Sequence, residues 1–409
     1  MQNLKVFNDP VYGFIEVGNN FLLKLIDHRF FQKSRRIKQL GVTEFVYPGA
    51  VHTRFQHAMG AMHLMGKALN TLRSKGITIS DKEKEACEIA ILLHDIGHGP
   101  FSHSLEEVLM PGIEHESISY QFMLKLNEEF DGRLNLALKI FRNSYERKFF
   151  HELVSSQLDM DRLDYLIRDS YFTGVPEGSI NVERLIQLLN VDEDRLVLEE
   201  KAIYVVENFL SARRLMYWQV YLHKTSIGAE KIITNIIKRA RDLYSFGQKI
   251  PMSPALEYFF ANKINIEQLS ENEEAMDHFS KLDDTDIWGS IKIWRDNKDP
   301  ILSHLCNMIL ERKLLKVRLS NEPIDKSELQ RLKHQVTKKF NVLMSDTHYF
   351  MSHGPVTNEA YILGGKPINI ITKKEGVKDI AYASDLPNIQ AISKIVLKYY
   401  QCWPKGLTL

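Results

Sequence analysis

Residues 91–103 contain three histidines and one aspartate, directly after an apolar run. Neutral imidazole together with carboxylate is a good ligand set for a divalent metal of intermediate softness. His94 and His98 are four residues apart, so on a helix they would share one face, with Asp95 at the edge of that face. Two hydrogen-bonded histidines at a helix end are the alternative, which a single histidine would favour. The whole cluster favours a metal site.

The segment 156–169 is predicted to form a helix with one polar and one apolar face. Its polar face holds residues at positions i, i+3, i+4, i+7 and i+8, namely Asp161, Asp164, Tyr165, Arg168 and Asp169. Such a stripe is most often a solvated row of ion pairs. Because the opposite face is apolar and a buried metal needs a further carboxylate, we interpret this helix as part of the site.

Two further predicted helices carry residues suited to phosphates. The stretch 32–41 is basic and ends near Gly41. Basic helices are usually just solvated, but arginine also binds triphosphates in a bidentate manner. Along one side of the second helix, two cations flank two rings, in the order Arg213, Tyr217, Tyr221 and Lys224. Such a row can bracket a nucleotide, although ordinary packing also produces it.

Helices must position these side chains. One helix is expected over 54–76, and another runs from a cap at Asp81 to His94. Gly97 and Pro100 then break the helix and turn side chains and backbone N–H groups toward a ligand. Residues 133–149 have the pattern of an amphipathic surface helix. From about residue 340, short strands are predicted at 361–363, 368–371 and 379–381.

The composition is that of an ordinary globular protein, with 44% hydrophobic and 26% charged residues among 409. The net charge of +1 argues against broad nucleic-acid binding. Three well-separated cysteines form no CxxC motif and indicate reduced thiols. The N-terminus has no signal-peptide pattern, and no apolar run approaches the roughly 18 residues of a membrane span. We therefore expect a cytoplasmic protein with no membrane partner.

His57, His94, Asp95 and Asp161 together give the order H…HD…D, and the chain resembles the HD phosphohydrolase superfamily. Within it, three longer stretches look like the deoxynucleoside triphosphate triphosphohydrolases: Arg54–His57, His94–His103 and Asp161–Asp169. The similarity is greatest to the branch containing the animal SAM-and-HD-domain enzyme and its bacterial relatives, which Lys5–Pro10 and Tyr221–Lys224 also fit. The resemblance ends near residue 330. We predict an HD domain with an N-terminal regulatory segment over 1–330 and a small α+β region over 331–409.

The resemblance implies a mainly helical fold that hydrolyses a dNTP to deoxynucleoside and inorganic triphosphate, with metal-activated water attacking the α-phosphorus. The implied metal ligands are His57, His94, Asp95 and Asp161, which suit Mn, Mg, Fe, Zn, Co or Ni. The implied catalytic acid/base and phosphate-contacting residues are His98, His103 and His115, with Asp95. The implied substrate-binding residues are Gln39, Arg54, Arg162, Tyr165, Asp169, Arg213, Tyr217, Tyr221 and Lys224.

Within the substrate-binding set, Arg54, Arg213 and Lys224 are expected to clamp the phosphates. Tyr165 and Tyr221 are expected to pack against the sugar, with Asp169 and Gln39 at its 3′-hydroxyl. The sequence departs from the animal enzyme at two of these positions, because Arg162 replaces a lysine and Tyr217 replaces a histidine. The resemblance therefore does not fix the preferred base.

The resemblance also implies a regulatory site between subunits. Eight residues match positions that bind an activating nucleotide in the animal enzyme: Lys5, Val6, Asn8, Asp27, Gln32, Arg35, Arg312 and Lys316. A GTP or dNTP activator and a homo-oligomer, dimer or tetramer, are the corresponding expectations.

Other functions fit parts of the pattern. Another HD phosphohydrolase acting on cyclic or signalling nucleotides is the nearest alternative, although Arg213 and the Tyr221–Lys224 stretch argue against it. A zinc peptidase is disfavoured because a glycine interrupts the motif and Asp95 replaces the glutamate base. A nucleotide-sensing protein without turnover is disfavoured because all four metal ligands are present.

Overall fold

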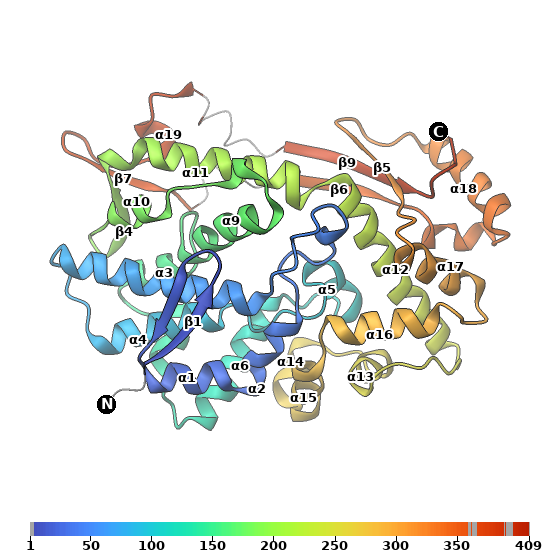
Figure 1. Cartoon of the computed structure of the whole chain (residues 1–409), viewed down its shortest axis with the longest axis horizontal. Coiled ribbons are helices and arrows are strands. Elements are labelled where there is room, and N and C mark those ends of the chain that lie inside the picture. Colours follow the sequence, from blue (N-terminus) through green and yellow to red (C-terminus); the bar gives the residue numbers. More distant parts are fainter. Residues whose placement is uncertain (1–3, 359–360, 362–365, 388, 390–395, 409) are drawn as a thin grey trace.

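The computed structural model describes residues 4–358, 361, 366–387, 389 and 396–408. Most of these residues are helical, and the strands form small sheets at the periphery (Figure 1). This arrangement confirms the predicted mainly helical fold with additional C-terminal strands. Within the described residues, no helix combines the length and the apolar character required to cross a bilayer.

Three helices form the centre of the fold. Helix α3 (Arg54–Ser74) packs against both α4 (Asp81–Leu93) and α9 (Met160–Thr173). Each begins at a side-chain cap that satisfies free backbone N–H groups: Thr53 with Gln56, Ser80 with Glu83, and Asp159. The prediction of a cap at Asp81 was therefore wrong by one residue, because Ser80 provides both hydrogen-bonding groups.

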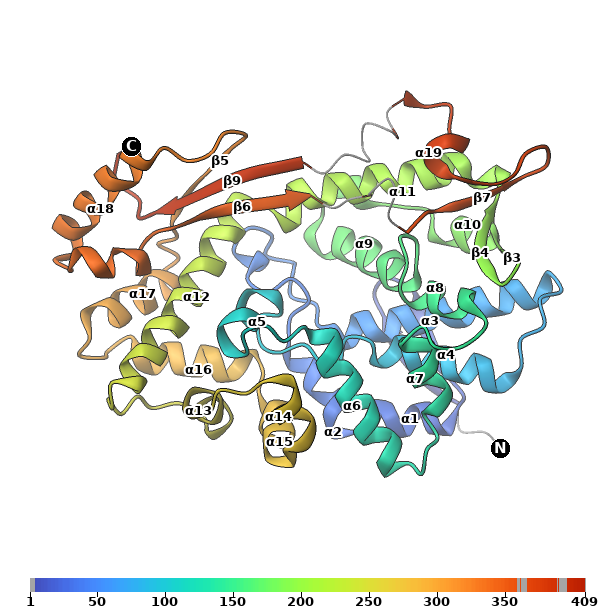
Figure 2. The same cartoon turned by 180° about the vertical axis from the view of Figure 1, so that it is seen from behind.

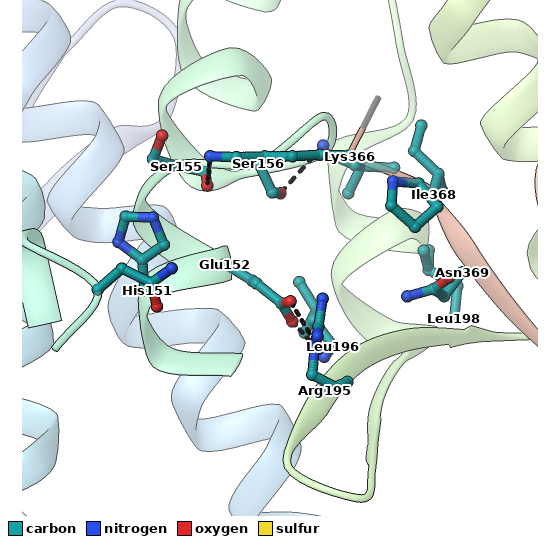
Figure 3. Close-up of a pocket in the computed structure, with 13 residues that line it drawn as sticks. His151, Glu152, Ser155, Ser156, Arg195, Leu196, Leu198, Lys366, Ile368 and Asn369 are labelled. Atoms are coloured by element: carbon teal, nitrogen blue, oxygen red, sulfur yellow. Dashed lines mark hydrogen bonds and ion pairs between the residues drawn. The ribbon is translucent and has the colours of Figure 1, made fainter. Parts of the chain in front are cut away.

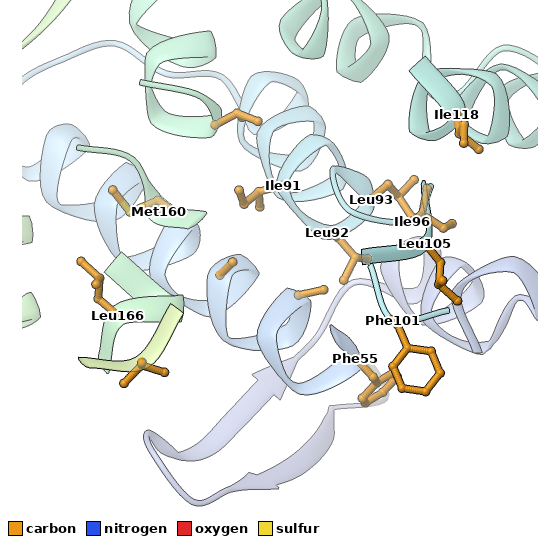
Figure 4. Close-up of a cluster of buried hydrophobic side chains, with 14 of the residues drawn as sticks. Phe55, Ile91, Leu92, Leu93, Ile96, Phe101, Leu105, Ile118, Met160 and Leu166 are labelled. Carbon is orange, nitrogen blue, oxygen red and sulfur yellow. The ribbon is translucent and has the colours of Figure 1, made fainter. Parts of the chain in front are cut away.

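Apolar side chains lock these helices and the loop after α4 together. Figure 4 shows Ile91, Leu92 and Leu93 of α4 pointing into a cluster that also contains Met160 and Leu166 of α9. All five side chains are fully buried. Because this packing fixes the end of α4 relative to α9, it fixes His94 relative to Asp161.

Further helices surround the centre. Residues 20–216 contribute α1 (Asn20–Asp27), α2 (Arg29–Gln32), α5 (His103–Leu109), α6 (His115–Glu129), α7 (Asn135–Phe141), α8 (Lys148–Val154), α10 (Val182–Gln187) and α11 (Ile203–Met216). On the right of Figure 1 lie α12 (Lys224–Ser245), α13 (Pro254–Ala261), α16 (Asp284–Trp294), α17 (Pro300–Leu310) and α18 (Lys326–Phe340), and at its lower centre lie α14 (Ile266–Glu271) and α15 (Glu273–Lys281). The short helix α19 (Ile380–Ala383) lies beside α11 (Figure 2).

The strands form three sheets within the described residues. An antiparallel N-terminal hairpin consists of β1 (Lys5–Asp9) and β2 (Gly13–Val17). A four-stranded sheet has the order β3 (Leu189–Asp192), β4 (Arg195–Glu199), β7 (Asn369–Thr372) and β8 (Gly376–Asp379), in which only β4 and β7 are parallel. A three-stranded antiparallel sheet has the order β5 (Lys316–Ser320), β9 (Val396–Trp403) and β6 (Ser352–Asn358).

Strand pairs cross the predicted domain boundary at residue 330. Strand β7 extends the β3–β4 hairpin of the first region, and β5 pairs with β9 of the second. The boundary itself stays a prediction. Of the three tail strands predicted from the sequence, 368–371 corresponds closely to β7. The segment 379–381 instead contains the end of β8 and the start of α19, and 361–363 falls largely outside the described residues.

Two predicted helices are shorter than expected. The basic stretch 32–41 is helical only to Arg36, because Ile37 is extended and buried and the next residue forms a β-bridge with Thr53. The stretch 133–149 holds α7 and the start of α8. Asn143, with a left-handed φ of 53°, follows α7 and separates the two helices.

Candidate metal centre and active site

Side chains from three helices meet inside the molecule: His57 in α3, His94 after α4 and Asp161 in the first turn of α9. The Oδ1 atom of Asp161 lies 3.0 Å from His57 Nε2 and 3.3 Å from His94 Nε2. Asp95 lies beside them, with Oδ1 3.3 Å from His94 Nε2 and Oδ2 3.8 Å from His57 Nε2. The structure thus brings all four predicted ligands together.

Both imidazoles present Nε2 to this point because Nδ1 is engaged elsewhere. His57 Nδ1 lies 2.8 Å from an Asp164 carboxylate oxygen, and His94 Nδ1 lies 2.6 Å from the Ile91 carbonyl oxygen. With Nδ1–H donating, Nε2 keeps its lone pair. Both Nε2 atoms are buried and make no well-aligned hydrogen bond in the described structure, despite the nearby Asp161. Buried nitrogen lone pairs converging beside carboxylates fit a divalent metal ion.

The charges around this cluster also favour a cation. Burial disfavours the imidazolium form of His57, but contacts with Asp161 and Asp164 raise its pKa to about 10. Burial likewise opposes the charge on His94, yet Asp95 and Asp161 raise its pKa. Burial also opposes ionisation of Asp161, whose pKa the two imidazoles nevertheless hold far below its ordinary value. The carboxylates of the cluster thus attract positive charge. Protons on the imidazoles supply that charge in the free chain, and a divalent metal ion can take their place.

A second group adjoins the first. The rings of His98 and His115 stack with centroids 3.8 Å apart, and Glu106 Oε1 lies 2.8 Å from His98 Nδ1. Arg54 donates a hydrogen bond to Asp95, and His98 Nε2 lies 3.5 Å from the other oxygen of that carboxylate. Burial and the Arg54 guanidinium lower the pKa of His98 to about 3, so this imidazole is neutral. A guanidinium beside two imidazoles suits an incoming phosphate.

The loop between His98 and α5 is held in an unusual conformation. Phe101 and Ser102 have φ angles of 55° and 49°, in the left-handed region that side chains disfavour. The buried carboxylate of Asp284 accepts a hydrogen bond from the Phe101 amide and another from the Lys38 amide. His103 is the first residue of α5, but its side chain lies outside the described part, so its catalytic role stays a prediction.

The predicted sugar-binding residues form one group. The rings of Tyr165 and Tyr221 meet edge to face, with centroids 6.1 Å apart. Tyr221 donates its hydroxyl hydrogen to Asp169 Oδ2 at 2.8 Å, and His52 Nε2 lies 2.7 Å from Asp169 Oδ1. Because Asp169 is buried, its clearest role here is to orient Tyr221. The side-chain oxygen of Gln39 is buried without a hydrogen-bond partner among the described residues, so it can accept a ligand hydroxyl.

The predicted phosphate-binding cations lie in different settings. Burial raises the pKa of Tyr165, and Arg213 and Arg162 partly oppose this shift, which places both guanidinium groups near its hydroxyl. Arg213 donates to the Gln157 side chain at 2.8 Å. Tyr217 stacks edge to face on Tyr221, with centroids 5.4 Å apart, in a π-helical turn. By contrast, Lys224 is exposed at the start of α12, and its phosphate-binding role stays a prediction.

A cavity of about 420 Å³ opens beside the metal cluster. Its walls include three of the predicted ligands, together with His115 and the cations Arg142 and Arg162. A smaller cavity of about 260 Å³ shares three wall residues with it, namely Asn143, His151 and Ser155. Figure 3 shows the ion pair between Glu152 and Arg195 inside the smaller cavity, and Lys366 of the C-terminal region along its rim. The two cavities are therefore neighbours, and the C-terminal region lines the smaller one.

The predicted regulatory residues lie mainly near the N-terminal hairpin. Lys5, Val6 and Asn8 are in β1, and Lys5 pairs with Asp27 at 3.4 Å. Gln32 accepts a hydrogen bond from Arg35, which lies over the Phe55 ring. Arg312, in contrast, donates to the Phe45 carbonyl oxygen, and Lys316 begins β5. No activator or subunit contact is visible in one chain, so this site stays a prediction.

Sequence reasoning assigned no role to several residues that shape the site. Asp164 and Arg168 were placed on the polar face of their helix, but their partner Asp9 and the connection to His57 were not foreseen. His52 and Glu106, which hold Asp169 and His98, were also missed. The only available signal was residue type, because Asp9 and His52 are more than 100 residues from their partners, and Glu106, eight residues after His98, lies across a helix break.

Comparisons with known proteins agree with this geometry. The HD domain model matches residues 54–169, and the HD associated region model matches residues 180–247. The uncharacterized protein YwfO of Bacillus subtilis is 32% identical over 95% of this chain and 89% of its own length. A crystal structure of a phosphohydrolase from Bacteroides thetaiotaomicron has 47% identity and a TM-score of 0.95, covering 98% of this chain and all of that one. The deoxynucleoside triphosphate triphosphohydrolase SAMHD1 homologue of Dictyostelium discoideum is 30% identical over 58% of this chain and 49% of its own length.

Proposed function

Because this chain belongs to the HD-domain family, we propose that it hydrolyses deoxynucleoside triphosphates to deoxynucleoside and intact inorganic triphosphate. At the coarser level it is an HD phosphohydrolase with a cluster suited to a divalent metal. The observation that carries the proposal is the convergence of His57, His94 and Asp161 beside the His98–His115 pair and Arg54. The name of the Dictyostelium relative supports the choice of substrate.

A divalent cation bound by His57, His94, Asp95 and Asp161 supplies Lewis acidity and a readily ionised water. In the proposed reaction, water adds to the α-phosphorus, the bond from that phosphorus to the 5′-oxygen breaks, and the 5′-oxygen takes up a proton. The chain must therefore hold the phosphates in line and deliver that proton.

His98 and its neighbours are suited to the proton transfer. In the free chain His98 is neutral, because burial and Arg54 lower its pKa to about 3. Triphosphate bound against Arg54 and His98 brings negative charge that favours the imidazolium form. Glu106 at Nδ1 stabilises that charge and fixes the ring. In the proposed reaction, this imidazole is the group that delivers the proton to the 5′-oxygen.

In this proposal, the remaining cations and the tyrosine pair bind the substrate. Arg162 lines the cavity at the metal cluster, and Arg213 lies nearby, close to the Tyr165 hydroxyl. Both are placed to neutralise phosphate oxygens. Tyr165 and Tyr221, held edge to face, present a rigid ring surface for the deoxyribose. A ring packed tightly against C2′ disfavours a ribose hydroxyl, which selects dNTPs over NTPs.

We further propose that GTP or a dNTP activates the enzyme at the N-terminal residues and that the working form is a homo-oligomer. Light scattering coupled to size-exclusion chromatography, with and without GTP, tests the assembly. A monomer under both conditions, with turnover independent of added nucleotide, would contradict this part and leave the chemistry untouched.

A dNTP panel tests the main proposal. Each dNTP is incubated with Mn²⁺ or Mg²⁺, with and without GTP, and the products are separated by chromatography. The Asp95→Ala variant is the test of the site, and Asp81→Ala is its control, because Asp81 begins the helix that ends just before His94 and Asp95 and is almost fully exposed. Deoxynucleoside plus triphosphate, lost only in Asp95→Ala, is the expected result.

Other products would lead to other conclusions. Monophosphate plus pyrophosphate would mean that a different bond is cut. No turnover under any combination would contradict the proposal and favour an HD phosphodiesterase of a signalling nucleotide, or a nucleotide-sensing protein.

A further inference from the structure

A continuous series of buried polar contacts leads from the N-terminal hairpin to a metal ligand. Asp9, the last residue of β1, accepts a hydrogen bond from Arg168 Nη1 at 2.8 Å. The same guanidinium donates to both oxygens of Asp164, at 2.9 and 3.0 Å. Asp164 Oδ2 in turn lies 2.8 Å from His57 Nδ1. Four side chains from β1, α9 and α3 thus form one series that ends on the imidazole at the metal centre.

The series is enclosed on all sides. The side chains of His57, Asp164 and Arg168 are fully buried, and that of Asp9 is 5% exposed. At Gly60, one turn after His57, an added Cβ would lie 2.0 Å from Asp164 Oδ1. The ring of Tyr12, in the hairpin turn, covers the Arg168 guanidinium from a further side at 5.5 Å. The Asp164 carboxylate therefore has little freedom to move away from His57.

Asp9 also organises the hairpin itself. Its Oδ1 atom accepts hydrogen bonds from the backbone amides of Val11 and Tyr12, at 2.9 and 3.0 Å. One carboxylate thus shapes the turn between β1 and β2 and neutralises Arg168. The hairpin can keep both the turn hydrogen bonds and the ion pair with Arg168 only while it remains packed against α9.

We propose that Asp9, Arg168 and Asp164 are positioning residues for the metal ligand His57, and that they couple the seating of the N-terminal hairpin to metal binding. Asp164 orients the imidazole and makes Nε2 a stronger ligand. Arg168 holds Asp164 through two hydrogen bonds, and Asp9 is the second carboxylate that pairs with the Arg168 guanidinium. Without the Asp9 carboxylate, the buried positive charge of Arg168 is paired with Asp164 alone. We expect the Asp164 carboxylate then to be drawn toward Arg168 and to hold His57 less well.

A purely structural ion network does not account for this arrangement. Such a network would serve equally well anywhere between β1 and α9, whereas this one terminates on the ring nitrogen opposite the metal-binding atom. Coupling is reciprocal, so if hairpin seating favours metal binding, metal binding must favour hairpin seating. That reciprocity gives a readout that a merely structural role would not move.

The inference rests on the metal centre of the proposed function, and it is tested by metal binding rather than turnover. Titration with Co²⁺ alone, followed by visible absorption, gives the affinity of the whole protein. The test variant is Asp9→Asn, because asparagine retains an oxygen for the turn but removes the charge facing Arg168. The matched control is Glu16→Gln, which makes the same charge change on β2, at an exposed residue between the buried Ile15 and Val17.

Asp9→Asn is expected to weaken Co²⁺ binding about 10- to 100-fold, as loss of a partner beyond the metal ligands does elsewhere. Glu16→Gln should bind like the natural chain. If Asp9→Asn fails to fold, Arg168→Lys provides the same test, because lysine keeps the charge but loses the paired contacts to Asp164. Equal affinities for a folded variant and the natural chain would overturn the inference.

Hydrogen exchange on the natural chain provides a test without mutation. Co²⁺ is expected to slow amide exchange in residues 5–17, with little change in the β3–β4 hairpin at 189–199. Exchange in 5–17 that Co²⁺ does not alter would refute the coupling. Absent Co²⁺ binding would overturn the metal centre itself. Bound Co²⁺ without dNTP turnover would contradict the substrate assignment only, so the two failures are distinguishable.

Discussion

Replacing Gly97 with alanine is expected to lower turnover about 100-fold while sparing metal binding. A Cβ atom at Gly97 would lie 2.3 Å from the His115 carbonyl oxygen and 2.3 Å from the Ser119 amide nitrogen. Both atoms are backbone, so no change of rotamer relieves the overlap. The start of α6 must therefore shift by about 1 Å to reach an ordinary contact.

This shift carries His115 away from His98, whose ring it now stacks on at 3.8 Å. A displacement of about 1 Å in a catalytic group can cost about 100-fold in rate. The three helices that supply His57, His94 and Asp161 pack elsewhere, so Co²⁺ affinity should change little.

Gly99→Ala is the matched control for this prediction. Neither glycine has a positive φ, and the added Cβ at Gly99 would meet only the Phe279 ring at 3.5 Å, an ordinary contact. Steady-state kinetics with the preferred dNTP should give a kcat/KM close to the natural value for Gly99→Ala and a loss of about 100-fold for Gly97→Ala. Comparable activities for the two variants would refute the reasoning that the His98–His115 stack depends on this close approach.

Three further predictions concern stability and substrate binding. Gly60→Ala should lower the free energy of unfolding by about 1–3 kcal/mol in urea titrations, because overlap with a buried carboxylate outweighs the helix-propensity gain of about 1 kcal/mol. Gly66→Ala, whose Cβ would meet only a flexible glutamate end at 3.2 Å, should not be destabilised. Burial lowers the pKa of Lys33 from 10.5 to about 7, so the charged group costs stability below pH 7 and this cost is relieved as pH rises toward 10.5. Lys33→Met should therefore be more stable than the natural chain at pH 6.5, with a difference that shrinks by pH 10; a constant difference would contradict this origin. Arg213→Ala should raise the KM for dNTP at least about tenfold, whereas Arg214→Ala should not; equal effects would argue against a phosphate contact.

The sequence was sufficient to predict the metal cluster because its information is local. His94 and Asp95 are adjacent, and Asp161 opens a helix with a clear apolar face, so these three were recognisable from the sequence pattern. His57 joined them only through the H…HD…D order of the family that the chain resembles. Chain-wide packing then only had to bring α3, α4 and α9 together, which their apolar faces ensure. The helical class was predictable for the same reason.

Contacts between distant segments were not predictable in this way. The partner of Arg168 is Asp9, 159 residues earlier, and strand β7 pairs with β4 far from it in the chain. Nothing in residue type or periodicity distinguishes these partners from other aspartates and other strands. The end of the basic helix after Arg36 has the same origin, because burial of Ile37 and the bridge to Thr53 override local helix propensity.

The two histidines proposed as metal ligands, His94 and His57, differ in what orients their rings. His94 is oriented by a backbone carbonyl, that of Ile91, which no substitution removes. His57 is oriented by the side chain of Asp164, whose charge depends on Arg168 and, through it, on the hairpin. We therefore expect the strength of metal binding to change through His57 without a change in any ligand. An effector that seats or unseats the hairpin would act on the same ligand, which gives the N-terminal segment a direct physical route to the catalytic centre.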